Sequence, residues 1–152
     1  MSTNLIHILL VEDDEIDAEA IVRAFRRKRI DNPLTIVTDG HEALQTLRGN
    51  GGRPSISSPY LILLDLNLPK MNGIEFLQHL RQDEKLKHSI VFVLTTSDRD
   101  EDKWAAYKQN VAGYMIKARA GRNFANVTAL LETYWRTVEF PPRETRYDPA
   151  DH

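Results

Sequence analysis

The sequence contains no cysteine, which excludes disulfide bonds and metal sites built from thiolates. It also lacks long apolar runs, and the longest, such as residues 8–11, are far too short to span a bilayer. Residues 1–4 (MSTN) lack the basic start and the apolar stretch of a signal peptide. These absences predict a cytoplasmic protein that does not enter a membrane.

Positive charge is not in excess either. Lysine and arginine number 20 against 22 aspartates and glutamates, so the net charge is −2 and nucleic acid is not an expected partner. The basic residues 26–29 have no aromatic residues among them and are typical of the solvated end of a helix. With 152 residues, 41% of them hydrophobic and 28% charged, the chain suits one globular domain with a sizeable core.

Five short apolar runs alternate with five segments whose apolar residues recur at helical spacing. With right-handed crossovers, this alternation predicts a doubly wound parallel α/β sheet with helices on both faces and all strand carboxyl ends at one edge. In the fourth helix, Trp104 and Tyr107 are expected to point inward. The predicted strands are residues 7–11, 34–37, 61–64, 89–94 and 111–116, and the predicted helices are residues 14–29, 41–48, 74–80, 98–110 and 123–138.

The run that organises the chain is LILLDLNLPKMNG, residues 61–73. Its apolar residues suit a strand that is covered on both faces, and this strand ends in a single carboxylate, Asp65. Burying a carboxylate is costly, so Asp65 is expected at the carboxyl end of the strand, where ligands also bind in open α/β sheets. A helix cap is a poor alternative, because no helix starts directly after Asp65.

Three other predicted strands also end in polar side chains, and each has an ordinary explanation. Glu12 and Asp13 can cap the next helix. Thr95 can be a buried strand residue, and Lys117 can be a solvated surface lysine. Together, however, three carboxylates at one edge require a cation, and oxygen ligands suit Mg²⁺. Asp65 is then the expected nucleophile toward phosphorus, with Thr95 and Lys117 binding the phosphoryl oxygens.

Four motifs accompany these strand ends: VED at residues 11–13, LLDLNLPKMNG at 63–73, LTTS at 94–97 and YMIK at 114–117. They resemble the receiver domains of two-component response regulators, and the resemblance covers about residues 8–138. It implies a flavodoxin-like fold with strand order 2-1-3-4-5, a receiver domain over residues 1–140 and a tail over residues 141–152. It also implies a signalling switch rather than an enzyme, phosphorylated by a sensor histidine kinase.

The resemblance also assigns roles to single residues. Asp14 lies just outside the acid pair in this register and is interpreted as a helix cap. Two positions depart from the usual family pattern: Glu12, where aspartate is commoner, and Ala118, where proline usually follows the lysine. The implied roles are an acid pair at Glu12 and Asp13, a phospho-accepting Asp65, a main-chain Mg²⁺ ligand at Asn67, a switch hydroxyl at Thr95, an aromatic switch at Tyr114 and a phosphate-binding Lys117.

Both departures, together with Asp17, DLNLP, LTTS and YWRTVEFPP at residues 134–142, resemble the single-domain regulators that accompany cyanobacterial and bacterial phytochromes. That resemblance implies a phytochrome-type kinase as partner and a homodimer formed through the C-terminal helix and tail. Trp135, Val138 and Phe140 are the expected dimer contacts, because the last helix runs out of sheet to cover there. The alternative is that they fold back on their own core.

Two other functions stay open. A degenerate receiver would act as an interaction module without phosphorylation, and Ala118 in place of proline keeps this alternative open. An aspartate-nucleophile phosphohydrolase would share the nucleophile and the metal, but that family needs a second acid two residues after the nucleophile. This position holds Asn67, so a phosphorylation-dependent binding switch is the preferred interpretation.

Overall fold

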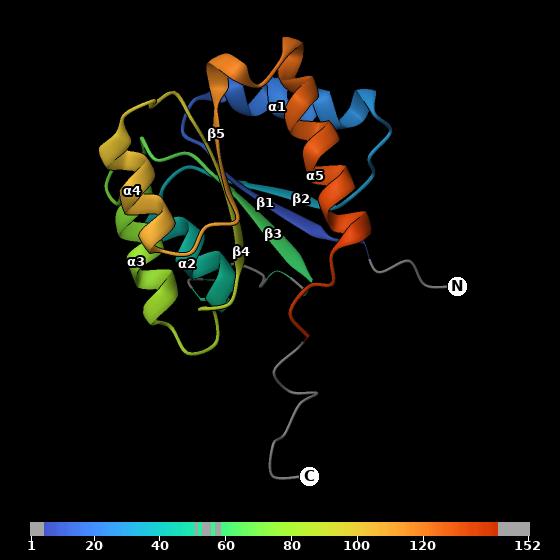
Figure 1. Ribbon diagram of the computed structural model, residues 1–152. Coiled ribbons are helices and arrows are strands. Elements are labelled where there is room, and N and C mark those ends of the chain that lie inside the picture. The colour runs from blue at the N-terminus through green and yellow to red at the C-terminus, as the bar shows by residue number, and fades with distance from the viewer. Residues whose placement is uncertain (1–4, 51, 53–55, 57–58, 143–152) are drawn as a thin grey trace.

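The computed structural model describes residues 5–50, 52, 56 and 59–142. Its five strands form one parallel sheet in the order β2-β1-β3-β4-β5, which confirms the predicted fold (Figure 1). The predicted tail, residues 141–152, lies outside the described residues from residue 143 onward. The strands are β1 (His7–Val11), β2 (Leu34–Val37), β3 (Tyr60–Leu64), β4 (Ile90–Thr95) and β5 (Gly113–Ile116).

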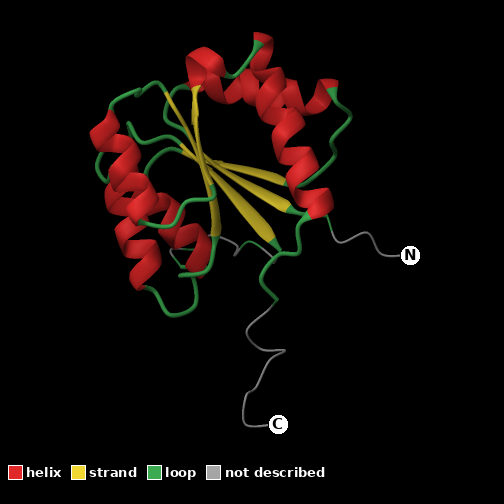
Figure 2. Ribbon diagram, viewed as in Figure 1, coloured by secondary structure: helices red, strands yellow, loops and turns green. Residues whose placement is uncertain are grey.

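Helices cover both faces of this sheet. They are α1 (Glu15–Arg27), α2 (Gly40–Arg48), α3 (Gly73–Gln82), α4 (Asp100–Lys108) and α5 (Ala125–Thr137), with the 3₁₀ turns η1 (Lys117–Arg119) and η2 (Arg122–Phe124) before α5. Figure 2 shows α1 and α5 on one side of the sheet and α2, α3 and α4 on the other. Within the described part of the chain, no helix has the length and apolar character needed to cross a membrane.

The strands are apolar on both faces because each face meets a different group of helices. In β3, Leu61 and Leu63 pack in the core formed with α1 and α5, while Ile62 and Leu64 pack in the core formed with α2, α3 and α4. All four side chains are completely buried. Full burial of such a side chain contributes roughly 1.5–3 kcal/mol, so β3 firmly fixes the position of the residue that follows it, Asp65.

Helix α4 does not follow the prediction. Trp104 is 69% exposed and Tyr107 is 51% exposed, so the expectation that both point inward is wrong. The side chain that α4 buries is that of Ala106, which is small enough to let the helix lie close to the sheet. Residues 104–107 are all apolar or aromatic, and at about 100° per residue they point to every side of the helix. The sequence therefore does not define an inner face here.

Candidate functional site

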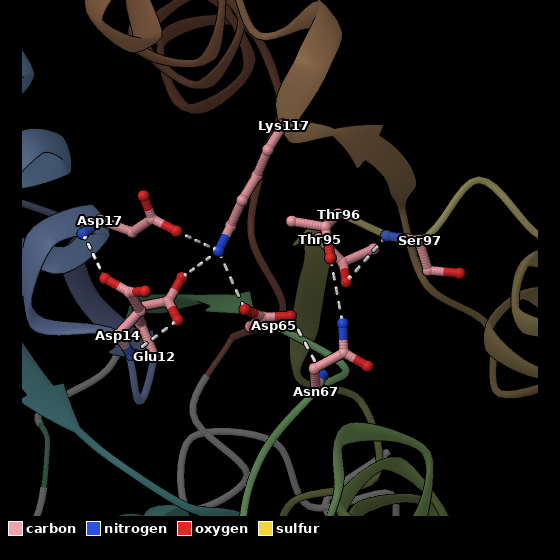
Figure 3. Close-up of polar contacts among 9 residues, drawn as sticks. All are labelled: Glu12, Asp14, Asp17, Asp65, Asn67, Thr95, Thr96, Ser97 and Lys117. Atoms are coloured by element: carbon pink, nitrogen blue, oxygen red, sulfur yellow. Dashed lines mark hydrogen bonds and ion pairs between the residues drawn. The ribbon is translucent and has the colours of Figure 1, made fainter.

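The strand ends bring the predicted residues to one edge of the sheet (Figure 3). The parallel ladders continue one residue beyond β1 and β3. The Glu12 N–H donates to the Val37 carbonyl at 2.9 Å, and the Asp65 N–H donates to the Val11 carbonyl at 3.0 Å. These backbone bonds fix Glu12 and Asp65 at the carboxyl edge. Lys117, the first residue of η1, directly follows β5 and reaches the same edge.

Lys117 lies at the centre of the site, and its side chain is only 10% exposed. Its ammonium donates to Glu12 Oε1 at 2.7 Å, to Asp17 Oδ2 at 2.7 Å and to Asp65 Oδ2 at 3.0 Å. Burial lowers the pKa of Lys117, but these hydrogen bonds outweigh burial and raise the pKa above its ordinary value. The lysine therefore stays charged, and it reaches Asp65 although Ala118 rather than proline follows it.

Glu12 is the most deeply buried acid of the site, at 3% exposure. Its pKa is raised from 4.5 to about 7, chiefly by burial and also by the nearby charge of Asp65. Hydrogen bonds from Lys117 and from the Asp14 N–H, at 3.1 Å to Oε2, oppose this rise. Burial therefore makes Glu12 hold its proton more tightly than a solvated glutamate does.

Asp65 is 6% exposed and is held through both carboxylate oxygens. Oδ1 accepts from the Asn67 N–H at 3.0 Å, and Oδ2 accepts from Lys117. The Asn67 side chain donates to Thr96 Oγ1 at 3.2 Å, which connects the loop after β3 to the loop after β4. One backbone donor and one charged donor thus hold the carboxylate in a single orientation.

Asp13 is exposed and lines an open hollow of about 450 Å³ together with Asn67. Among the residues that the structure describes, no three acidic, histidine or cysteine side chains converge to hold a metal ion. The Lys117 ammonium occupies the position of a cation between Glu12 and Asp65. The donors nevertheless fit Mg²⁺ or Mn²⁺, because the carboxylates of Asp13 and Asp65 and the Asn67 carbonyl offer only oxygen.

The two predicted switch residues both meet Ser97. Thr95 is completely buried at the end of β4, and its hydroxyl accepts a long hydrogen bond of 3.5 Å from the Ser97 N–H. Tyr114 donates its hydroxyl to the Ser97 carbonyl at 3.0 Å. The Ser97 hydroxyl is hydrogen-bonded to Asp102 in α4. Thr95 and Tyr114 are thus linked through one residue of the loop between β4 and α4.

The three predicted dimer residues lie in different environments. Trp135 stacks on Phe25, with ring centroids 6.3 Å apart, and Phe140 meets the edge of Tyr134 at 5.9 Å. Val138 is 41% exposed. The chain therefore uses part of this aromatic surface for its own core and leaves Val138 open to solvent.

Asp17 also belongs to the site, because it contacts Lys117, although the sequence analysis assigned it no role there. It lies in the first turn of α1, where Asp14 caps the helix by accepting from the Asp17 N–H at 3.0 Å. This confirms the predicted cap. Because α1 begins at the carboxyl edge, an acid in its first turn can reach the site. Acids are also favoured there by the helix dipole alone, so the sequence pattern that includes Asp17 does not predict its contact with Lys117.

Known proteins similar to this chain define its family. The family model of the response regulator receiver domain matches residues 8–128, and the chain belongs to this family. Response regulator Rcp1 from Synechocystis sp. is 38% identical over 135 residues, which cover 88% of this chain and 92% of Rcp1. The probable methanogenesis regulatory protein FilR2 from Methanothrix harundinacea is 39% identical over 130 residues, which cover 84% of this chain and 82% of FilR2.

Solved structures agree with this assignment. The phosphorylated cyanobacterial phytochrome response regulator RcpA has a TM-score of 0.82 at 36% identity, covering 91% of this chain and 99% of RcpA. The Mn(2+)-bound form of Rcp1 has a TM-score of 0.77 at 36% identity, covering 90% of this chain and 99% of Rcp1. The receiver fold and the resemblance to phytochrome response regulators are therefore confirmed.

Proposed function

We propose that this chain is a phospho-accepting response regulator in which Asp65 receives a phosphoryl group from a sensor histidine kinase. The observation that carries the proposal is the 3.0 Å contact between the Lys117 ammonium and Asp65 Oδ2 at the carboxyl edge of a receiver fold. A carboxylate nucleophile lies beside a fixed cation, and such a cation can bind the oxygens of an incoming phosphoryl group.

The proposed transfer forms a bond between an Asp65 carboxylate oxygen and phosphorus. The bond from phosphorus to the imidazole nitrogen of the kinase breaks, and its electron pair leaves with the imidazole. The product is an acyl phosphate that carries a charge of about −2. Lys117 supplies a charged donor to the new phosphoryl oxygens, while the Asn67 N–H keeps the carboxyl group oriented.

Mg²⁺ is the cofactor we propose, held by Asp13, Asp65 and the main-chain carbonyl of Asn67, with Glu12 as the second acid of the pair. When bound, it would reduce the repulsion between the carboxylates and the phosphoryl oxygens. The all-oxygen donor set at this edge supports the assignment. The Mn(2+)-bound structure of the relative Rcp1 supports it as well.

In this proposal, the switch operates through Thr95 and Tyr114. The new negative charge attracts the Thr95 hydroxyl and Lys117 toward the phosphoryl oxygens. Thr95 then gives up its long bond to Ser97, whose carbonyl also holds Tyr114. The loop after β4 and the Tyr114 side chain change together, and the surface formed by α4, β5 and α5 changes with them. The output is an altered contact with another protein.

The proposed partners are a phytochrome-type histidine kinase and a second copy of this chain. Similarity to Rcp1 and to the phytochrome response regulator RcpA supports the kinase. Exposed apolar surface along and beyond α5, where Leu130 is 44% and Val138 is 41% exposed, supports the homodimer. Trp135 and Phe140 are only partly buried in their own core, and the exposed parts of their rings would contribute to the same dimer surface.

Incubation with acetyl phosphate and Mg²⁺ tests phosphorylation. The intact mass of the wild-type protein should rise by one phosphoryl group, and Asp65→Asn should show no rise because it lacks the nucleophile. Asp31→Asn, which removes an exposed carboxylate between α1 and β2, is the control that should still gain the group. No gain in the wild type, or a gain that survives in Asp65→Asn, would contradict the proposal.

Two further measurements separate the alternatives. A phosphohydrolase would release phosphate from a monoester over many turnovers, and a steady release would overturn the proposal. Its second acid would lie at Asn67, whose side chain donates a hydrogen bond to Thr96. A degenerate receiver would keep the same dimer constant and kinase affinity after phosphorylation, as measured by analytical ultracentrifugation and titration.

A further inference from the structure

Asp17 reaches the site from a different element than the other acids (Figure 3). Its Oδ2 accepts from the Lys117 ammonium at 2.7 Å, the same distance as from Lys117 to Glu12 and shorter than the 3.0 Å to Asp65. Glu12 and Asp65 follow strands, whereas Asp17 lies in the first turn of α1. The lysine is therefore held by a helix as well as by the sheet.

The three carboxylates match the donors of the lysine in number. An ammonium has three N–H groups, and three carboxylates lie within hydrogen-bond distance of it. The side chains of Glu12 and Asp65 are 2% and 6% exposed, whereas that of Asp17 is 30% exposed. Asp17 is thus the partner that solvent reaches and that is not among the proposed metal ligands.

A divalent cation and the lysine compete for the same oxygens. Glu12 and Asp65 now face Lys117, and the proposed cation needs a share of these carboxylates. If Lys117 lost its contacts with both acids and had no other partner, its ammonium would be an unpaired, mostly buried charge. Such a charge is costly in folding free energy. The contact with Asp17 supplies the missing partner.

The capping network fixes the position of Asp17. The Asp17 N–H donates to the Asp14 carboxylate at 3.0 Å, and the Asp14 N–H donates to Glu12 Oε2 at 3.1 Å. The start of α1 and the acid pair therefore form one connected unit. Ala118, which follows Lys117 in η1, lacks the fixed φ of proline, and Asp17 holds the lysine from outside this turn.

We propose that Asp17 is a positioning residue that retains the Lys117 ammonium when Glu12 and Asp65 turn to a divalent cation and a phosphoryl group. This inference rests on the proposed phosphoryl transfer to Asp65. In this role Asp17 acts through the Lys117 ammonium, to which it is hydrogen-bonded, and not directly on the reacting atoms or the divalent cation.

Mn²⁺ binding, followed by loss of the free-ion signal in electron paramagnetic resonance, tests this role without phosphorylation. Asp17→Asn should raise the Mn²⁺ dissociation constant roughly three- to tenfold, because the lysine then competes more strongly for Glu12 and Asp65. Glu15→Gln is the matched control, since Glu15 is an exposed acid in the same first turn, and it should change the constant less than about twofold. Asp17→Glu restores the carboxylate and should recover most of the affinity.

A second background separates positioning from a simple effect of charge. In Lys117→Met, adding Asp17→Asn should shift the Mn²⁺ dissociation constant no more than adding Glu15→Gln does, because Asp17 acts through the lysine. An equal shift from Asp17→Asn in both backgrounds overturns the inference. Equal shifts from Asp17→Asn and Glu15→Gln in the wild-type background overturn it as well.

Phosphorylation by acetyl phosphate distinguishes failure of this inference from failure of the proposed function. In Asp17→Asn, the Mg²⁺ concentration that gives half-maximal phosphorylation should rise about as much as the Mn²⁺ dissociation constant does. If the wild type gains no phosphoryl group, the proposed function fails and the role of Asp17 falls with it. If the wild type is phosphorylated and Asp17→Asn keeps the wild-type half-saturation, only the role of Asp17 falls.

Discussion

Two partly buried cations lie at opposite ends of the sheet, and their partners differ in kind. Lys117, at the carboxyl edge, faces three carboxylates. Arg81, in the last turn of α3, faces backbone carbonyls at the amino ends of β4 and β5. Its guanidinium donates through Nε to Gln109 O at 2.6 Å, through Nη1 to Lys87 O and Ser89 O at 2.8 Å each, and through Nη2 to Asn110 O at 3.1 Å.

At the Arg81 end of the sheet, all four hydrogen-bond acceptors are neutral backbone carbonyls. A single side chain ties the end of α3 to the two turns that lead into β4 and β5. Burial lowers the pKa of Arg81, but an arginine stays charged, and its carbonyl partners neither titrate nor carry charge. The interactions at this end therefore stabilise the fold, and the charge of the acceptors does not change with pH.

The Lys117 end, in contrast, has an excess of negative charge. Three carboxylates share one ammonium, and burial with charge repulsion raises the pKa of Glu12 to about 7. A proton, a divalent cation or a phosphoryl group can each change this balance. The partners of a cation thus decide its role: neutral carbonyls make it structural, whereas surplus carboxylates make a site that can rearrange.

Replacing Arg81 should cause the largest loss of stability. Arg81→Met keeps an apolar stem but removes every donor to the four carbonyls, so the free energy of unfolding should fall by about 2–4 kcal/mol. Urea denaturation followed by circular dichroism measures the loss. The folded variant should bind Mn²⁺ with wild-type affinity, because no partner of Arg81 lies at the carboxyl edge.

Arg48→Met is the matched control for this prediction. Arg48 lies in the last turn of α2 and pairs with Asp83 at 3.0 Å, but its side chain is 40% exposed. Loss of such a surface pair should cost less than about 1 kcal/mol. Equal losses in Arg48→Met and Arg81→Met would contradict the structural role assigned to Arg81.

The site at the carboxyl edge should make the free energy of unfolding depend on pH. The raised pKa of Glu12 determines whether stability rises or falls with pH. Its pKa is raised on folding from 4.5 to about 7, so the folded state holds this proton more tightly than the unfolded state does. The resulting stabilisation is complete below the unfolded pKa and is lost as the pH rises through the folded pKa. Over this window the contribution of Glu12 to the free energy of unfolding should fall by about 1–3 kcal/mol.

Denaturation of the wild type and of Glu12→Gln at a series of pH values isolates this contribution. The difference between the two proteins should change mainly between pH 4.5 and about 7, because glutamine does not titrate. Arg81→Met should be less stable at every pH but should keep the wild-type pH dependence. If Glu12→Gln follows the wild-type curve, the raised pKa of Glu12 is wrong.

The sheet was predictable because a buried parallel strand is encoded locally. Residues 61–64 form an unbroken apolar run and are completely buried on both faces, as that pattern requires. The same run placed Asp65 at the edge, because backbone pairing fixes the residue that follows a strand. The acid pair was predicted as a unit, but the structure buries Glu12 and exposes Asp13, since consecutive residues of an extended chain point to opposite sides.

Contacts between distant segments were not predictable in the same way. Arg81 binds backbone carbonyls, which give no signal in residue type, and Asp17 is separated from Lys117 by 100 residues. In α4, the aromatic side chains of Trp104 and Tyr107 suggested an inner face that the helix does not use. All of these features depend on how each helix is set against the sheet, which apolar periodicity does not determine.

The smallest expected effect is the rise in the free energy of unfolding when Mg²⁺ binds. It tests directly whether the two ends of the sheet act independently. Mg²⁺ at ten times its dissociation constant should raise the free energy of unfolding of the wild type by about 1.4 kcal/mol. Arg81→Met should gain the same increment from a lower baseline, whereas Asp65→Asn should gain little because it loses a proposed ligand. Urea denaturation with and without Mg²⁺, at matched ionic strength, measures each increment.

The rise in the free energy of unfolding that Mg²⁺ causes in Arg81→Met shows whether the two ends of the sheet act independently. Mutations that share no partner and lie far apart usually contribute additively to stability, and Arg81 shares none with Lys117. An increment in Arg81→Met that differs from the wild type by more than about 0.5 kcal/mol would show that the amino end of the sheet influences cation binding at the carboxyl edge. The division into a structural arginine and a functional lysine would then be wrong, because both cations would belong to one coupled system.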